Sequence, residues 1–346
     1  MKSDTKVVTF GEVMMRLTPP DFLRFTQARS FDVLYAGAEV NVAIALANLG
    51  VPVEFITCLP ENELGDACLN YIRQFGVGTT HIIRGGDRLG TYFVETGAVQ
   101  RGNKVIYDRA NSAFANIQPG MIDWNDVFTD AQWFHWSGIT PAVSKSAADT
   151  CLDAVKAAKK KGLTVSTDLN YRSKLWKWGK TPQEIMSHLM TYVDIVVGNE
   201  EDMDKVFGIK APGVNVAKGQ LDVKQYKVVT QKMMQRFPQL TAVAITLRQS
   251  LSASHNKWTG VLSDGKTFYT STNYDISHIV DRVGAGDAFS AGLISQLLHD
   301  PNRQHALDFA VALSCLKHTI YGDSSVITAD EVHKLMKGIG SGRIVR

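Results

Sequence analysis

Short runs of β-branched and aromatic residues alternate along this chain with longer segments whose apolar residues recur at helical spacing. This alternation is typical of parallel strands joined by helices that cover both faces of a sheet. We therefore expect an α/β fold built on a mainly parallel sheet. The predicted strands are residues 6–10, 53–58, 133–136, 163–167, 194–197 and 241–247.

Two helical segments end in a way that supports this fold class. Residues 41–49 carry apolar side chains at helical spacing and are followed by Gly50 and Pro52, and residues 144–160 are followed by Gly162. Glycine commonly ends a helix, and proline commonly follows it. Each helix then leads into a predicted strand, which is the order of a βαβ crossover.

Two further stretches depart from this order. In residues 14–35 and 90–109, polar and apolar positions alternate, with Gly102 and Asn103 at the expected hairpin turn. Strands in this region would bury only one face, so we expect a small β-sheet lid over the main sheet. No linker or repeat divides the chain. The prediction is a single domain over residues 1–346, with lid segments inserted at about residues 12–36 and 88–110.

Composition excludes several classes of protein. Of the 346 residues 45% are apolar, enough for a sizeable core, which argues against a disordered chain. The net charge of +3 is spread without a basic block, so neither nucleic acid nor a membrane is an expected partner. The four cysteines lie far apart, and no signal peptide or membrane-spanning run is present. We expect a soluble, cytoplasmic protein without a disulfide framework or a zinc site.

Residues 260–267 match the P-loop pattern G-x-x-x-x-G-K-T. A P-loop binds phosphate because it lies between a strand and a helix whose N-terminus faces the anion. Here the next residues, 268–272, are strand-like, and Asp264-Gly265 is a turn dipeptide. We interpret this segment as a β-hairpin without a phosphate site.

A second glycine-containing segment carries candidate chemistry. Residues 281–289 read D-R-V-G-A-G-D-A-F and precede apolar residues at helical spacing. Gly284, Ala285 and Gly286 would turn the backbone so that its N–H groups form an anion hole at the helix start. Asp287, in the first helical turn, is expected to be ionised and to accept a proton from an attacking hydroxyl group. The simpler alternative is a glycine turn in which Asp287 only caps the helix.

This segment is similar to the signature D-T-x-G-A-G-D of the ribokinase-like carbohydrate kinases of the PfkB family. Residues 37–43, G-A-E-V-N-V-A, resemble the family's sugar-binding glycine and the helix after it, with Gly37, Ala38 and Asn41 as substrate contacts. The resemblance extends from about Gly11 to Asp323. It implies a ribokinase-like three-layer sandwich with a β lid, ATP and Mg²⁺ as cofactors, and Asp287 as the catalytic base.

Within the family, residues 107–113, 168–172 and 317–323 are most similar to 2-keto-3-deoxygluconate kinases. A sugar acid carries a carboxylate that arginines bind in charge-assisted pairs, whereas a neutral sugar needs no cation. Arg109, at the end of a lid strand, and Arg172, in a loop after a core strand, are candidates for that contact. The resemblance adds three further substrate contacts, which are Tyr92 and Tyr107 on the lid strands and Asp323.

For the nucleotide, the resemblance points to Asn170, Thr246 and Arg248, together with Gly284 and Gly286. The chain departs from the family pattern in this region. It continues Arg248-Gln249-Ser250 where a glycine usually follows the threonine, residues 199–202 read N-E-E-D where N-x-x-E is common, and Arg282 replaces the signature threonine. Arg282 either contacts phosphate or faces solvent. Mg²⁺ is expected to bind mainly through ATP phosphates and water, and no residue is assigned as a metal ligand.

The expected reaction is transfer of the ATP γ-phosphoryl group to the terminal hydroxyl of 2-keto-3-deoxygluconate, which gives 2-keto-3-deoxy-6-phosphogluconate. The alternatives are another sugar kinase of the same family, of fructokinase or ribokinase type, and a non-catalytic sugar sensor. A nicotinamide dehydrogenase is disfavoured because no G-x-G-x-x-G comes after the first strand. Exposed edges of the lid strands predict a homo-oligomer.

Overall fold

The computed structural model describes residues 6–213 and 222–339, so the ends of the predicted domain lie outside the described residues. Its central sheet has the order β14-β13-β12-β11-β10-β9-β1-β4, with β15 paired to β13. The strands from β4 to β12 in this order are parallel. The strands are β1 (Lys6–Phe10), β4 (Val53–Ile56), β9 (Ala131–Ser137), β10 (Thr164–Asp168), β11 (Ile195–Asn199), β12 (Ala242–Ser252), β13 (His255–Ser263), β14 (Phe268–Thr270) and β15 (Tyr274–Ile276).

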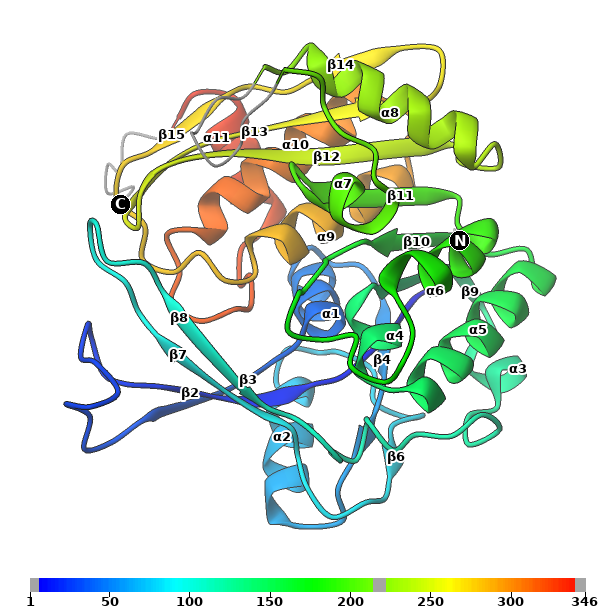
Figure 1. Cartoon of the computed structure of the whole chain (residues 1–346), viewed down its shortest axis with the longest axis vertical. Helices are drawn as coiled ribbons and strands as arrows, with labels where there is room; N and C mark the ends of the chain where they lie inside the picture. The colour runs from blue at the N-terminus through cyan, green and yellow to red at the C-terminus, as the bar shows by residue number, and fades with distance from the viewer. Residues whose placement is uncertain (1–5, 214–221, 340–346) are drawn as a thin grey trace.

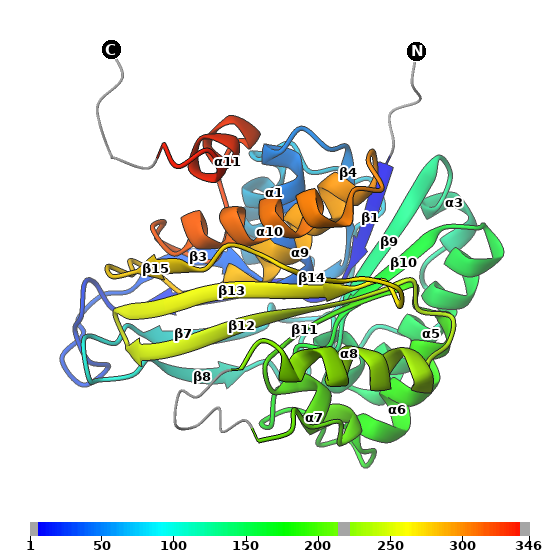
Figure 2. The ribbon, with the colours of Figure 1, turned by 90° about the horizontal axis from the view of Figure 1, so that it is seen from above.

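Helices cover both faces of this sheet, which confirms the predicted α/β fold with three layers (Figure 2). One face carries α1 (Ala38–Asn48), α9 (Ala285–Leu297) and α10 (Arg303–Lys317), with α11 (Ala329–Met336) beyond them. The other carries α3 (Trp124–Val127), α5 (Lys145–Lys160), α6 (Pro182–Leu189), α7 (Asp202–Phe207) and α8 (Gln225–Arg236). The remaining short elements are α2 (Glu63–Arg73), α4 (Ile139–Val143), the 3₁₀ turn Met190–Tyr192, β5 (Cys58–Leu59) and β6 (Ile83–Arg84).

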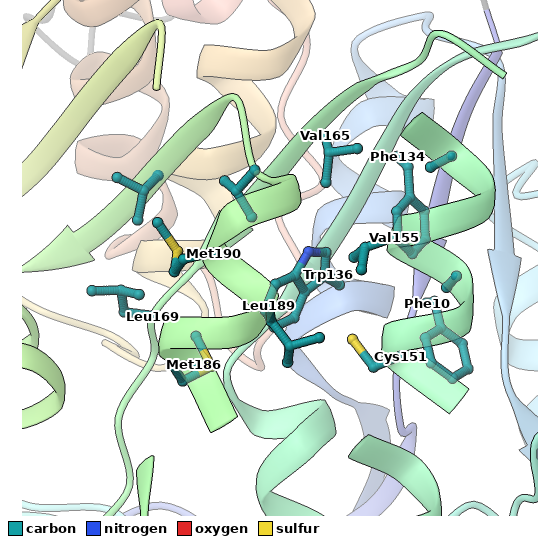
Figure 3. Packing of buried hydrophobic residues seen from close by; sticks show 14 of the residues in the cluster. Phe10, Phe134, Trp136, Cys151, Val155, Val165, Leu169, Met186, Leu189 and Met190 are labelled. Carbon is teal, nitrogen blue, oxygen red and sulfur yellow. The ribbon is translucent and has the colours of Figure 1, made fainter. Parts of the chain in front are cut away.

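Two hydrophobic cores lie on the two faces of the sheet because successive strand residues point in opposite directions. Val7 belongs to the core beneath α1 and α9, whereas Val8 belongs to the core beneath α5 and α6. Figure 3 shows part of the second core, where Trp136 of β9 packs against Cys151 of α5 and Leu189 of α6. Burial of each large apolar side chain contributes roughly 1.5–3 kcal/mol, so both faces hold the sheet in place.

The predicted helices form close to their expected bounds. α5 begins after Ser144, whose Oγ accepts a 3.1 Å hydrogen bond from the backbone N–H of Ala147. α1 begins at Ala38, three residues earlier than predicted (41 − 38), and Asn41 already donates its backbone N–H to the carbonyl of Gly37 at 2.8 Å. The four cysteines are free thiols, as expected.

The stretches that departed from the α/β pattern form a separate four-stranded sheet of order β3-β2-β7-β8, which confirms the predicted lid (Figure 1). The predicted turn at Gly102 and Asn103 is wrong, because the chain reverses between Ala98 and Arg101, whose backbones exchange hydrogen bonds of 2.9 and 2.8 Å. Asn103 instead accepts the backbone N–H of Gly97 at 2.8 Å with its side chain. The lid strands are β2 (Met14–Thr18), β3 (Asp32–Ala36), β7 (Thr91–Glu95) and β8 (Lys104–Asp108).

The segment that matches the P-loop pattern is a β-hairpin, as predicted. β13 and β14 pair antiparallel on either side of it, and Asp264 accepts the backbone N–H groups of Lys266 and Thr267 within the turn. The strand that precedes β13 in the chain is β12, which continues to Ser252, beyond the predicted end at residue 247. Among the residues described, no helix combines the length and apolar character needed to cross a membrane.

Candidate active site

A cavity of about 390 Å³ lies between the lid and the carboxyl ends of the parallel strands. Loops at this edge of an open α/β sheet are where such folds bind ligands. Every site residue predicted from the sequence lines this cavity, although the sequence places them on many separate elements. They are Gly37, Ala38, Asn41, Tyr92, Tyr107, Arg109, Asn170, Arg172, Thr246, Arg248, Gly284, Ala285, Gly286, Asp287 and Asp323.

The N-terminus of α9 points its free backbone N–H groups at the cavity. The first intrahelical hydrogen bond runs from Ala288 N–H to the carbonyl of Gly284 at 2.9 Å, so the N–H groups of residues 285–287 have no intrahelical acceptor. Gly284 has φ +82°, and a Cβ atom there would lie 1.9 Å from the carbonyl oxygen of Asp323. Only glycine fits this turn, and the free N–H groups beside Asp287 form a candidate anion hole.

Asp287 is the carboxylate nearest to this anion hole in sequence, and its environment differs from the expected one. Burial raises the pKa of Asp287 to about 7, and the nearby carboxylates Asp323 and Glu39 act in the same direction. A hydrogen bond from Nδ2 of Asn41 to Oδ2 of Asp287, 2.7 Å long, acts in the opposite direction. The expectation of a fully ionised Asp287 is therefore wrong, since desolvation outweighs the helix dipole. A pKa near neutrality suits a general base.

The floor of the cavity next to Asp287 is formed by the start of α1. Gly37 precedes this helix, and a Cβ atom there would lie 2.0 Å from the carbonyl oxygen of Glu12. The close approach of these two backbones brings Asn41, one helical turn later, against Asp287. The helix that resembles the family's sugar-binding helix thus contacts the candidate base directly.

Two tyrosines of the lid cover the cavity. Tyr92 is buried and donates a 2.7 Å hydrogen bond from its hydroxyl to Oδ2 of Asp323, and its ring stacks on that of Tyr107 with centroids 6.1 Å apart. The other oxygen of Asp323 accepts a hydrogen bond from Arg16, which also donates to Asp281 at 2.7 Å. Arg16 is fully buried, so this network ties lid strand β2 to the segment before α9.

The two arginines proposed for a substrate carboxylate lie in different environments. Arg109 is 7% exposed, and its guanidinium donates twice to Glu12, so its charge is already paired. Arg172 is exposed, its guanidinium donates to the carbonyl of Tyr171 at 2.9 Å, and it forms no ion pair within the described part of the chain. Because an unpaired cation binds an anion at lower cost, Arg172 fits a carboxylate better than Arg109 does.

The nucleotide residues suggested by the resemblance line the same cavity. Asn170 has φ +40°, and its backbone N–H donates to Oδ1 of Asp168 at 3.0 Å. Thr246 donates its hydroxyl to the carbonyl of Gly198 at 3.4 Å, and Arg248 lies 3.5 Å from Glu200. These contacts are made within the protein, and all of these residues line the cavity.

Four carboxylates that line the cavity were not assigned a role from the sequence, namely Glu12, Asp168, Glu200 and Asp202. Burial raises the pKa of both Asp168 and Asp202, and the charge of Asp202 raises the pKa of Asp168 further. Asp202 accepts the backbone N–H groups of Asn199 and Tyr171, at 2.8 and 3.2 Å, so it holds two strand ends together. The signals available in the sequence were the position of Asp168 directly after a predicted strand and the position of Asp202 at the end of the N-E-E-D stretch. Of the other two carboxylates, Glu12 is paired with Arg109, and Glu200 lies 3.5 Å from Arg248.

Known proteins match this chain over nearly its whole length. The pfkB family of carbohydrate kinases matches residues 4–329. A 2-dehydro-3-deoxygalactonokinase of Haloferax volcanii is 33% identical over 339 residues, which are 97% of this chain and 98% of that protein. The crystal structure of a 2-dehydro-3-deoxygluconokinase from Thermotoga maritima is 46% identical, with a TM-score of 0.89 over 96% of this chain and 100% of that one. A putative ribokinase II from E. coli, in complex with ATP and Mg²⁺, shares the fold with 19% identity and a TM-score of 0.79 over 96% of this chain and 99% of that one.

Proposed function

Because this chain belongs to the pfkB family of carbohydrate kinases, we propose that it transfers the γ-phosphoryl group of ATP to the terminal primary hydroxyl of 2-keto-3-deoxygluconate. This compound is also called 2-dehydro-3-deoxygluconate, and the product is 2-keto-3-deoxy-6-phosphogluconate. The observation that carries the proposal is the position of Asp287, between the anion hole of α9 and Asn41 of the candidate sugar helix.

The arrangement supports a direct displacement at phosphorus. Asp287 accepts the proton of the sugar hydroxyl as its oxygen attacks, and its pKa of about 7 lets it do so near neutral pH. The N–H groups of residues 285–287 stabilise negative charge on the transferring group. Tyr92 and Tyr107 close the lid side of the cavity, which excludes water as a competing acceptor.

Arg172 supports the sugar-acid assignment. It lines the cavity and forms no close ion pair among the described residues, although its charge lowers the pKa of Asp168, Asp202 and Asp287, which burial raises, so its guanidinium has donors free for a substrate carboxylate. The names of the relatives at 33% and 46% identity, a deoxygalactonokinase and a deoxygluconokinase, belong to sugar acids of this kind. Arg109, at the lid, remains a second candidate for contact with the substrate carboxylate, and it ranks below Arg172 because its charge is already paired with Glu12.

ATP with Mg²⁺ is the proposed phosphoryl donor. Within residues 6–213 and 222–339, no three His, Cys, Asp or Glu side chains are grouped so as to hold a metal ion. The site fits an ion that binds to the ATP phosphates and water with one protein carboxylate, and Asp168 or Glu200 at the cavity is suited to that role. Mg²⁺ would supply positive charge to the ATP phosphates. Asn170, Thr246 and Arg248 are the proposed nucleotide contacts.

The test is ADP release with Mg·ATP across a matched substrate panel. The panel is 2-keto-3-deoxygluconate, its galactonate epimer, gluconate, fructose, ribose and adenosine. We expect kcat/KM for the two keto-deoxy acids to exceed that for each neutral sugar by at least about tenfold, the effect of one charge-assisted contact. A preference for fructose or ribose would contradict the assignment of the substrate and favour a sugar kinase of fructokinase or ribokinase type. Sugar binding without ADP release would favour the sensor.

We also propose that the protein forms a homo-oligomer in the cytoplasm, as expected from the sequence. The outer strands of the lid, β3 and β8, each pair on one side only among the strands described, which leaves an edge for a second copy. Light scattering of the purified protein measures the subunit count, and a monomer at micromolar concentration would contradict this part of the proposal.

A further inference from the structure

Two departures from the family pattern, distant in sequence, meet at the cavity. Arg248 stands near the end of the parallel run of β12, where the related kinases usually carry a glycine nearby. Arg282 stands two residues before Gly284 (284 − 282), in place of the signature threonine. Both arginines line the same cavity as the anion hole. Burial lowers the pKa of Arg282 and the charge of Arg248 acts in the same direction, whereas the charge of Asp281 acts in the opposite direction.

Arg282 is held in place by backbone groups. Its Nη2 donates to the carbonyls of Ser252 and Ala253 at 3.0 and 2.6 Å. No ion pair to Arg282 occurs in the described ranges, and its Nε is shielded from solvent without any acceptor there. The guanidinium therefore carries a net charge and unused donors at the cavity.

Arg248 is only weakly paired. One of its terminal nitrogens lies 3.5 Å from Glu200, at the outer limit of a hydrogen bond, and its Nε is also shielded without an acceptor among the described residues. Two like charges that line one partly buried cavity repel one another, and a bound anion offsets that repulsion. A fixed pair of this kind costs free energy in the empty protein, and a polyanion would offset that cost.

A purely structural role explains part of this arrangement. The contacts of Arg282 with Ser252 and Ala253 pin the turn between β12 and β13. They do not account for the second arginine or for the unused donors of both guanidinium groups. Binding of an anion accounts for both.

We propose that Arg248 and Arg282 act together as a guanidinium pair that binds the phosphates of the donor nucleotide beyond its α-phosphate. This proposal rests on the proposed kinase function, because the transferred phosphoryl group would lie at the anion hole of residues 284–287. Arg282 lines the same cavity as that hole, which places its charge on the side of the phosphates next to the reacting one in this proposal. Planar guanidinium groups bind phosphate oxygens through paired hydrogen bonds.

The experiment measures binding by calorimetry without any sugar present. The probes are ADP, AMP and inorganic tripolyphosphate, each with the wild-type protein and with Arg248→Gln, Arg282→Gln and the double variant. Glutamine removes the charge and keeps a donor for the backbone carbonyls. The matched control is Arg29→Gln, because Arg29 is an exposed arginine of the lid loop that does not line the cavity. Thermal unfolding identifies any variant that fails to fold.

We expect each single variant to weaken ADP and tripolyphosphate binding by about 10- to 100-fold, with AMP changed less than about twofold, since a charge-assisted hydrogen bond contributes about 1.5–3 kcal/mol. The Arg29 variant should bind all three probes as the wild type does. If the arginine variants bound ADP as tightly as the wild type, or lost as much affinity for AMP as for ADP, the proposal that the two arginines bind these phosphates would be overturned. The kinase assignment would not be affected.

The tripolyphosphate arm separates this proposal from the proposed function. Suppose that the wild type binds tripolyphosphate more tightly than the arginine variants do but does not bind ADP. The guanidinium pair would then be supported as a polyphosphate site, and ATP would be excluded as the donor. If the wild type bound neither probe, the pair itself would be overturned. Should the Arg282 variant be destabilised, the Arg248 variant decides the outcome, because the side-chain contact of Arg248 is with Glu200 and not with the turn at residues 252–253.

Discussion

The side-chain amide of Asn41 donates a 2.7 Å hydrogen bond to Oδ2 of Asp287. This contact joins α1, near the start of the chain, to the first turn of α9, near its end (Figure 1). It favours the ionised carboxylate, whereas burial favours the protonated one. The balance places the pKa of Asp287 at about 7, so small changes around this pair should change activity near neutral pH.

Replacing Asp287 with Asn should lower kcat by about two orders of magnitude or more, because the amide cannot accept the hydroxyl proton. Substrate and nucleotide binding should persist, since the side chain keeps its shape. Steady-state ADP release measures turnover, and calorimetry measures binding. Asp153→Asn, on the exposed side of α5, is the control and should retain wild-type turnover. Turnover within about threefold of wild type in D287N would refute the assignment of the base.

Activity should fall with decreasing pH as Asp287 becomes protonated. A base with a pKa of about 7 loses about tenfold in kcat/KM per pH unit below that value and reaches a plateau above it. Asn41→Ala removes a hydrogen bond that lowers the pKa, so the acid limb should move to higher pH. The pH profile of kcat/KM for both proteins measures the shift. If the acid limb of N41A lay at the same pH as in the wild type or at a lower pH, the coupling between Asn41 and Asp287 would be contradicted.

Replacing Arg172 with Gln should raise KM for 2-keto-3-deoxygluconate by about 10- to 100-fold, because a charge-assisted contact to its carboxylate is lost. The charge of Arg172 also lowers the pKa of Asp287, so the variant should be measured at high pH, where the base is ionised. The KM for the carboxamide analogue of the substrate, which lacks the negative charge, should change little in this variant. Lys177→Gln in the same loop is the control, since Lys177 is exposed and outside the cavity. Equal losses for acid and amide would refute the contact.

Arg16→Met should destabilise the fold by about 3–5 kcal/mol, the cost of leaving buried carboxylates without their cation. Arg16 is fully buried and is bonded to both Asp281 and Asp323. Urea unfolding followed by circular dichroism measures the free energy of unfolding. The exposed pair Lys145 and Asp149 provides the comparison, and Lys145→Met should change stability by less than about 1 kcal/mol. A similarly small loss for R16M would show that the network is not a structural link.

Local patterns in the sequence predicted much of the fold. Strand and helix periods are properties of neighbouring residues, so the central strands, α5 and the lid could be located without the tertiary structure. The hairpin at residues 264–265 could be distinguished from a P-loop for the same reason, because the next element along the chain is a strand and not a helix. The lid turn was misplaced because Asn103 contacts Gly97 instead of forming the turn itself.

Residue types and spacing in the sequence thus indicated the α/β fold and the glycine turn before α9, and the resemblance to a kinase family supplied the candidate residues that line the cavity. Only the tertiary structure decided that Asp287 is buried enough for its pKa to be about 7, that Arg109 is already paired with Glu12, and that Arg248 and Arg282 line the same cavity. The physical reason is that desolvation and charge pairing depend on distances between residues far apart in the chain, which packing alone sets.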